Sequence, residues 1–210
     1  MIKKLALLVL ASSFMLTAKA DTIVVASSAL NTTNNSGDPT LNIDPNPNWY
    51  GPLAGSNWVS YAITGNPSDP GYTVVPNGTD VIFSQTFNLS APANGGTLSV
   101  LADDTTSVIL NGTTIYTAAL GGSYPTCSTQ PIGCLASTGA TIDLSAFLND
   151  FNVGANTLSF QVYQENGSSY GLDYAGTITT PEPGMFLMVG LGLMGLFVMR
   201  RRTFAGSFAS

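Results

Sequence analysis

The chain has 210 residues, and its six basic residues all lie before residue 20 or after residue 199; it contains no His. Residues 21–180 hold 11 of the 12 Asp and Glu residues and no basic side chain. Such a segment repels polyanions and has no cation to neutralise phosphates, so nucleic acid is excluded as its partner. Catalytic triads with a His or Lys base, and zinc sites with His ligands, are excluded from this segment as well.

The first 20 residues have the three parts of a secretory signal peptide. Lys3 and Lys4 supply positive charge ahead of an apolar run over residues 5–16, and Ala18 and Ala20 then form a small-x-small cleavage site. The apolar run is shorter than the roughly 20 residues that cross a bilayer, which disfavours a membrane-spanning helix. We therefore expect cleavage after Ala20 and export of the rest of the chain.

Export predicts that the two cysteines, Cys127 and Cys134, form a disulfide, because such bonds persist outside the cytoplasm. Closing so short a loop contributes about 2–3 kcal/mol on the chain-entropy argument, which is enough to fix one loop. A catalytic thiol is not expected, because residues 21–180 contain no basic group that would lower the pKa of the thiol.

Residues 21–180 show the texture of one all-β domain. Apolar residues alternate with Ser, Thr, Asn and Gln over residues 80–90, 97–102 and 156–164, which is the pattern of half-buried strands. No long helical pattern alternates with these strands, so a parallel α/β sheet is disfavoured. The sequence predicts an antiparallel β-sandwich.

Three local signals refine this prediction. Asn111-Gly112 separates two strand-like runs and predicts a two-residue hairpin. Residues 143–151 predict one short helix, capped by Asp143. The strand pattern is lost over residues 176–183, which predicts a linker, and we place the end of the domain at residue 180.

The segment over residues 181–202 joins Pro181-Glu182-Pro183 to an apolar run and to three arginines, Arg200, Arg201 and Arg202. This arrangement resembles the PEP-CTERM sorting signal of exported bacterial proteins. The resemblance implies a substrate of an exosortase, a membrane enzyme of Gram-negative bacteria that make exopolysaccharide, and a mature protein in the cell envelope or extracellular matrix. A plain tail anchor with an incidental Pro-Glu-Pro is the alternative.

The apolar run itself predicts a single transmembrane helix. Residues 184–199 would be about 24 Å long as a helix, and snorkelling arginines with local thinning can make up the difference from a bilayer core of about 30 Å. The positive-inside rule keeps the three arginines and a short tail over residues 203–210 in the cytoplasm. The protein would thus be anchored in the inner membrane during sorting.

The domain resembles galactose-binding-like and PA14-like jelly rolls. Four pieces carry the resemblance, in order: "SNWVSYA", "DVIFSQTFNLS", "LADDTTSVILNGTTIY" and "NVGANTLSFQVYQ". It implies a jelly-roll-like sandwich, and in PA14-like lectins a paired aspartate at this place coordinates calcium that holds sugar hydroxyls. The matching residues are Asp103 and Asp104, with Asn111 as a further oxygen ligand. The alternative is that the two aspartates form a solvated turn whose side chains bond nearby backbone N–H groups.

Aromatic side chains offer a second way to hold a sugar, because their faces suit the apolar faces of sugar rings. Trp49 and Tyr50 are the candidate ligand-binding residues. Trp49 lies in a Pro-rich loop and is expected to be exposed, whereas Trp58 is expected to pack inward. Three tyrosines are candidates for an opposite edge of such a site: Tyr163, Tyr170 and Tyr174.

These observations predict an exported, non-catalytic surface or matrix protein that associates with exopolysaccharide and needs no cofactor. A calcium-dependent carbohydrate-binding module is the alternative. A carboxylate pair for glycoside hydrolysis is the remaining catalytic hypothesis, and no spacing in the sequence identifies one.

Overall fold

The computed structural model describes residues 21–122, 125–181, 190–192 and 194–195. Thr22–Thr180 form one compact unit. The predicted signal peptide with Ala18 and Ala20, the motif residues Glu182 and Pro183, the three arginines and residues 203–210 lie outside the described residues. Residues 190–192 and 194–195 are helical, and no helix in the described parts of the chain is both long and apolar enough to cross a membrane.

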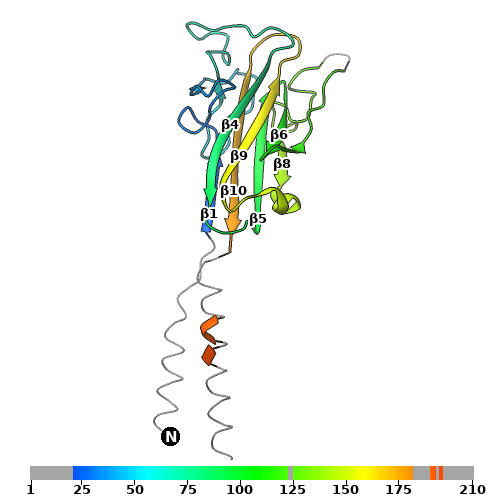
Figure 1. The fold of residues 1–210 in the computed structure, drawn as a ribbon. Helices are drawn as coiled ribbons and strands as arrows, with labels where there is room; N and C mark the ends of the chain where they lie inside the picture. The colour runs from blue at the N-terminus through cyan, green and yellow to red at the C-terminus, as the bar shows by residue number, and fades with distance from the viewer. Residues whose placement is uncertain (1–20, 123–124, 182–189, 193, 196–210) are drawn as a thin grey trace, which may run out of the picture. The chain divides into compact units, whose positions relative to one another are not determined.

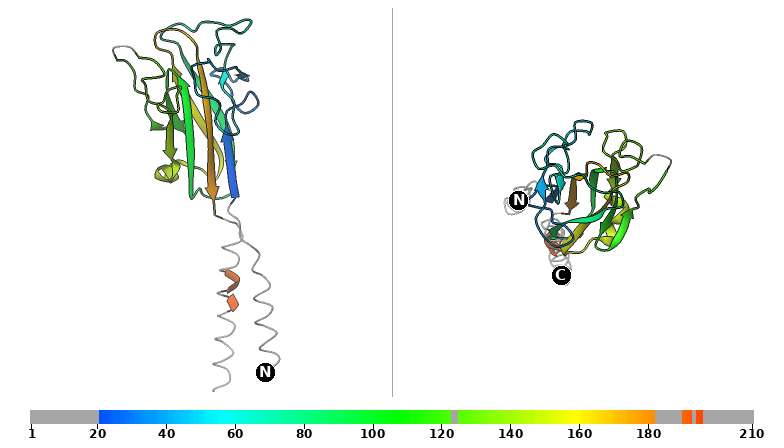
Figure 2. Two further views of the ribbon diagram at one scale, coloured as in Figure 1. Left: turned by 180° about the vertical axis from the view of Figure 1, so that it is seen from behind. Right: turned by 90° about the horizontal axis from the view of Figure 1, so that it is seen from above.

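The compact unit consists of two β-sheets facing one another (Figures 1 and 2). The first sheet has six strands in the order β2-β3-β10-β5-β8, with β1 paired to β10; the second has four strands in the order β4-β9-β6-β7. The strands of the first sheet are β1 (Asp21–Ala26), β2 (Leu41–Asn42), β3 (Val59–Ser60), β5 (Gly95–Asp103), β8 (Ala140–Asp143) and β10 (Gly171–Thr180). Those of the second are β4 (Asp80–Leu89), β6 (Thr105–Leu110), β7 (Thr113–Tyr116) and β9 (Gly154–Tyr163). The registered pairs are antiparallel, which confirms the predicted all-β sandwich.

The core lies between the sheets and follows the predicted alternation. On β4, Phe83 and Phe87 are buried while Thr86 is exposed, and β9 alternates in the same way. On β5 the alternation stops at Leu101, which is buried in a second core on the outer face. Phe160 of β9 stacks on Tyr174 of β10, with ring centroids 4.2 Å apart. Two of the tyrosines that we expected at the edge of a sugar site, Tyr170 and Tyr174, are fully buried, so that expectation is wrong for both.

The predicted hairpin and helix are both present. Asn111 and Gly112 have φ angles of 50° and 88°, which matches a turn that needs positive φ at both central positions. The helix is η1 (Leu144–Asp150), a 3-10 helix, and Asp143 caps it by accepting a hydrogen bond from the backbone N–H of Ser145 at 2.9 Å.

The predicted linker over residues 176–183 is wrong, because β10 continues to Thr180. Nine residues of β10 pair with β5, from Gly171 opposite Asp103 to Thr179 opposite Gly95. Ile178 is buried between the sheets while Thr177 is exposed, so the strand alternation exists. Because threonine occupies both inward and outward positions near its end, the hydrophobic pattern alone does not reveal it.

One buried carboxylate attaches a long loop to the outer face of the first sheet. Asp173 of β10 accepts hydrogen bonds from the hydroxyls of Ser27 (2.9 Å) and Ser56 (2.5 Å) and from the backbone N–H of Leu53 (2.7 Å). Burial raises the pKa of Asp173, although these donors oppose the rise. The loop that contains Leu53 and Ser56 is thereby fixed against the sheet.

We expect Asp173→Ala to destabilise the domain by about 2–3 kcal/mol, because it leaves a buried N–H and two hydroxyls without their acceptor. Urea unfolding of residues 21–181 measures the change. Asp38→Ala is the matched control, since Asp38 is exposed and surface changes are typically within about 0.5 kcal/mol. Equal stability of the two variants would contradict the anchoring role of Asp173.

Candidate functional site

The paired aspartates lie where the chain passes from one sheet to the other. Asp103 is the last residue of β5, Asp104 follows it, and β6 begins at Thr105 in the opposite sheet. The peptide bond between the two aspartates is cis. Each aspartate is only 3% exposed, so the solvated turn that served as the alternative interpretation is wrong.

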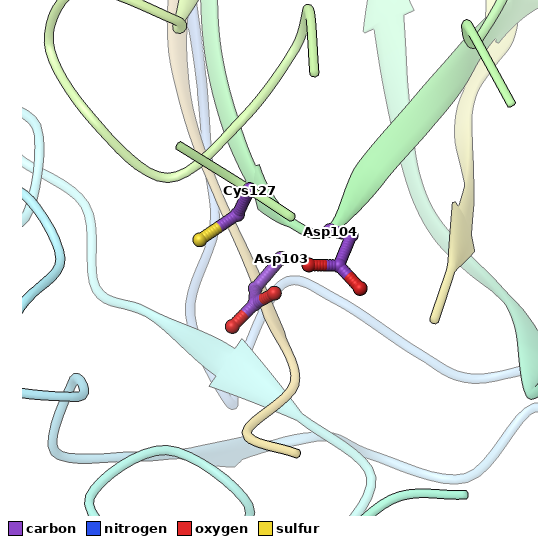
Figure 3. A group of neighbouring side chains, drawn as sticks. All are labelled: Asp103, Asp104 and Cys127. Carbon is purple, nitrogen blue, oxygen red and sulfur yellow. The ribbon is translucent and has the colours of Figure 1, made fainter. Parts of the chain in front are cut away.

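The two carboxylates have different partners. Oδ2 of Asp104 accepts a hydrogen bond from the backbone N–H of Glu165 at 2.7 Å, and the backbone N–H of Cys127 is a further donor. Oδ1 of Asp103 is buried and has no hydrogen-bond partner. Figure 3 shows the side chains of Asp103, Asp104 and Cys127 gathered in one place.

Burial of the two neighbouring carboxylates favours the binding of a proton or a cation. Burial raises the pKa of Asp103 well above its ordinary value, and both a hydrogen bond to Asp104 and the negative charge of Asp104 raise it further. Burial also raises the pKa of Asp104, against the opposing effect of its hydrogen-bond donors. No basic residue occurs in residues 21–180, so no side chain of this segment can neutralise either charge, and binding of a proton or a cation is favoured.

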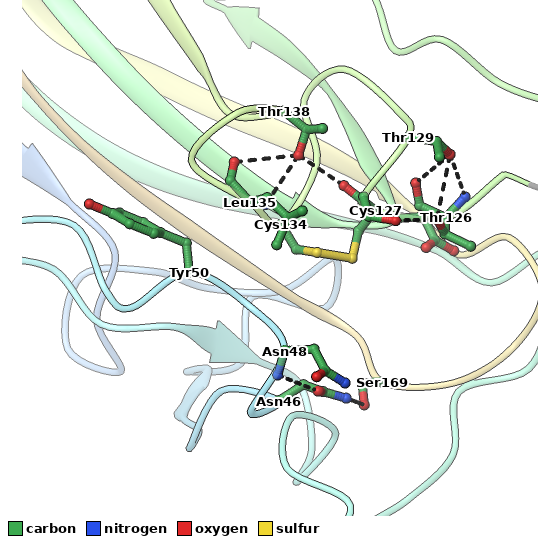
Figure 4. Close-up of a disulfide and its surroundings, with 12 residues drawn as sticks. Asn46, Asn48, Tyr50, Thr126, Cys127, Thr129, Cys134, Leu135, Thr138 and Ser169 are labelled. Carbon is green, nitrogen blue, oxygen red and sulfur yellow. Dashed lines mark hydrogen bonds between the residues drawn. A yellow bond between two sulfur atoms is a disulfide. The ribbon is translucent and has the colours of Figure 1, made fainter.

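The predicted disulfide is present, as Figure 4 shows, and Cys127 lies beside the aspartate pair. Cys127 and Cys134 are bonded, with Cα atoms 4.9 Å apart. The carbonyl of Cys134 accepts a hydrogen bond from the backbone N–H of Tyr50 at 2.8 Å, which ties the disulfide loop to the Pro-rich loop. A ligand atom of Cys127 lies within 4.8 Å of the carboxylate oxygens of Asp103 and Asp104, but a disulfide sulfur is not a thiolate and is not a competent metal ligand.

The Pro-rich loop, residues 43–58 between β2 and β3, packs on the outer face of the first sheet near the aspartate pair. The ring of Trp49 packs against that of Trp58, with centroids 4.5 Å apart, and the Trp49 side chain lies near enough to Asp103 to lower the pKa of that carboxyl, against the larger effect of burial. Trp58 is buried, as predicted, whereas Trp49 is only 9% exposed and the expectation that it is exposed is wrong. Tyr50 is 49% exposed and is the accessible aromatic of the predicted pair.

Asn111 does not belong to this site. It follows the far end of β6 from Asp104, and its side chain donates to the carbonyl of Asp150 (2.7 Å) and to Oδ1 of Asn156 (2.8 Å). Its Oδ1 accepts from the backbone N–H of Thr157 at 2.8 Å. The predicted grouping of Asn111 with the two aspartates is therefore wrong, because the asparagine holds the hairpin against neighbouring segments.

Glu165 is a site residue that the sequence analysis missed. Besides its backbone bond to Asp104, its side chain accepts hydrogen bonds from the backbone N–H of Gly121 (2.7 Å) and from Nε2 of Gln130 (3.1 Å). Its charge contributes to the raised pKa of Asp104. Only the pairing register of β6 and β9 could have revealed this residue. Thr105 lies opposite Tyr163, so the residues that follow β9 lie beside those that precede β6.

The oxygens of this pair are hard ligands of the kind that calcium takes in proteins. Asp103 and Asp104 lie together, and Asp103 Oδ1 is a buried acceptor with no donor. Calcium takes 6–8 oxygens, so backbone carbonyls or water would complete its coordination. The described residues therefore fit an ion that is held mainly by Asp103 and Asp104.

Comparison with known proteins identifies the tail and some loosely similar folds. Residues 179–202 match the PEP-CTERM protein-sorting motif, which confirms the resemblance seen in the sequence. Among curated proteins, none matches the chain. A family 35 carbohydrate binding module from Clostridium thermocellum is similar over 74% of this chain and 97% of its own, with 13% identity and a TM-score of 0.38. The PA14 domain of the MpAFP antifreeze protein is similar over 56% of this chain and 50% of its own, with 17% identity and a TM-score of 0.25. An α-L-rhamnosidase from Streptomyces avermitilis, complexed with L-rhamnose, is similar over 79% of this chain and 12% of its own (19% identity, TM-score 0.42).

The electrostatics of the site predict an unusual pH dependence of stability. The pKa values of Asp103, Asp104 and Asp173 all rise on folding, so the folded domain binds more protons than the unfolded chain above about pH 4. The stability that these groups contribute is fully present below the unfolded pKa of about 3.9 and is lost as pH rises through the folded pKa values. In EDTA, the Tm of residues 21–181 should therefore be higher at pH 5 than at pH 8.

Asp103→Asn should raise the Tm at pH 8 and flatten this dependence, because the amide needs no proton. Each unit of pKa elevation is worth about 1.4 kcal/mol, and each kcal/mol shifts Tm by roughly 2–4 °C in a domain of this size. Asp38→Asn, which removes the same charge from the exposed surface, is the control. A wild-type Tm that increases from pH 5 to pH 8 in EDTA would refute this account of the pair.

Proposed function

Because residues 179–202 carry the PEP-CTERM protein-sorting motif, we propose that the protein is an exported, non-catalytic component of the cell surface or extracellular matrix that an exosortase-type enzyme sorts. The motif is the observation that carries this proposal. The route has three steps: export by residues 1–20, retention in the inner membrane by the apolar run, and transfer of the domain to the envelope or matrix. Exopolysaccharide is the proposed partner there.

The chemistry of the domain supports a role in association and not in catalysis. Residues 21–180 contain no Lys, Arg or His, so carboxylates are the available acid–base groups. Asp103 and Asp104 are closed off from solvent, and Asp173 is engaged by three hydrogen bonds to its carboxylate. A hydrolase needs its carboxylates within reach of a substrate, and these three buried carboxylates do not meet that requirement. Among the described residues, the remaining carboxylates of the domain join no cluster of three or more Asp, Glu, Cys or His side chains.

The sorting proposal is tested by replacing Pro181 and Pro183 with Ala in the full chain, expressed together with an exosortase-type enzyme. We expect the processed form outside the inner membrane to be lost, because the motif is no longer presented. Ala at Pro67 and Pro70, two prolines of an exposed loop, provides the matched control. Immunoblots of membrane and extracellular fractions measure the outcome, and normal release of the motif variant would contradict the proposal.

A calcium-dependent carbohydrate-binding module is the second candidate. The observation that favours it is the buried carboxylate pair, in which Asp103 Oδ1 has no hydrogen-bond donor and no basic residue of the domain is available. A divalent cation would supply the missing positive charge. Asp103 and Asp104 would hold the ion, and the ion would supply positions that sugar hydroxyls can occupy.

The covering loops limit how a sugar could reach such an ion. Cys127 of the disulfide loop has its Sγ within 4.8 Å of carboxylate oxygens of Asp103 and Asp104, and the Trp49 side chain lies near enough to Asp103 to lower its pKa. A sugar that contacts the ion directly must therefore displace part of one loop. Tyr50 is already half exposed beside the disulfide loop and is the side chain that would stack on the sugar.

Calorimetric titration of residues 21–181 with CaCl₂ tests this candidate. We expect binding in the micromolar to millimolar range that Asp103→Asn abolishes and Asp38→Asn leaves unchanged. At 100 times the Kd, calcium would stabilise the domain by about 2.7 kcal/mol, which Tm measurements would detect independently. Failure of calcium to bind would remove the lectin candidate and leave the sorting proposal intact.

A further inference from the structure

The sorting motif and the folded domain overlap in the sequence. The match to the motif begins at residue 179, whereas β10 ends at Thr180. Two residues, Thr179 and Thr180, therefore belong both to the match and to a strand in the interior of a six-stranded sheet. An enzyme that cuts this region meets a chain that is partly locked into the fold.

The last residues of β10 are held by specific contacts. The carbonyl of Thr179 accepts a hydrogen bond from the backbone N–H of Asn94 at 2.9 Å, and its hydroxyl donates to Oδ1 of Asn94 at 2.6 Å. The side chains of Ile178 and Thr180 are 1% and 0% exposed. These contacts keep the strand paired to its end.

Pro181 marks the point at which this protection stops. Proline has no N–H and so cannot extend the hydrogen-bond ladder of β10, which ends at the preceding residue. Peptidases bind the backbone around the scissile bond, so a cut inside β10 requires its hydrogen bonds to open first. Pro181 thus marks the end of the segment that the sheet protects.

We propose that the fold sets the limit of processing: the mature chain ends at or beyond Pro181 and retains the whole of β10. This inference rests on the proposed sorting function and adds the position of the cut relative to the domain. Pro181 acts as a strand terminator as well as part of the recognition motif. Removal of the tail then leaves the sandwich complete, with Ile178 and Thr180 still buried.

Limited digestion of the full chain in detergent, with a protease of broad specificity, tests the limit without any sorting enzyme. We expect the resistant fragment to end at or beyond Pro181, as its intact mass will show. A fragment that ends within residues 171–180 would overturn the inference.

Two charge substitutions make this test sharper. Ile178→Asp places a carboxylate in the core and should increase trimming into β10 by about tenfold or more, because cleavage follows the population of the open strand. Thr177→Asp adds the same charge at the neighbouring exposed position and should leave the fragment unchanged. Equal trimming of both variants would count against the role of β10. If Ile178→Asp does not fold, the fragments from the wild type and from Thr177→Asp still decide the question.

The mature C-terminus from cells that express an exosortase-type enzyme separates this inference from the proposed function. A terminus at or beyond Pro181 supports both. A sorted protein that ends inside β10 overturns the inference and leaves the function. A full-length protein that stays in the membrane overturns the proposed sorting. In that case the limited digestion still tests whether β10 resists cleavage up to Pro181.

Discussion

The absence of positive charge between residues 21 and 180 is the constraint on which the rest of the structure depends. A buried carboxylate in this domain cannot form a salt bridge, so neutral donors, a proton or a bound ion must stabilise it. Neutral donors stabilise Asp173, which accepts hydrogen bonds from a backbone N–H and two hydroxyls. Asp103 lacks such donors on one of its carboxylate oxygens, which has no hydrogen-bond partner. This difference makes Asp103 the candidate site residue, whereas Asp173 anchors a loop.

This contrast arises because a second, smaller core covers one end of the first sheet on its outer face. It consists of Ile43, Trp49, Trp58, Leu101 and Cys134. Its residues come from the Pro-rich loop, from β5 and from the disulfide loop. The sheet is consequently buried on both faces there, and polar residues at outward positions, Asp103 and Asp173 among them, lose their contact with water.

The sequence predicts the fold well where side chains alternate clearly and where turns have strict backbone requirements. The strands around Phe83 and Phe160, the Asn111-Gly112 hairpin and the disulfide all follow from local patterns. The prediction from the sequence fails where packing between distant segments determines which side chains are buried. The outer core buries Trp49, which a Pro-rich segment gives no reason to expect, and it turns the aspartate pair from a surface turn into an interior group. Glu165 joins the site through strand register, which a single sequence does not reveal.

The first and last strands of the domain are neighbours, since β1 pairs with β10, and β10 is also paired to β5 over nine residues. In Figures 1 and 2, β1 begins and β10 ends at the same end of the sandwich, opposite the long loops. A tether attached after Thr180 therefore pulls along β10. When a partner holds the loop end, tension acts parallel to the strands, and the ladder between β10 and β5 resists it as a unit instead of opening one pair at a time. A protein built in this way would bear mechanical load through β10.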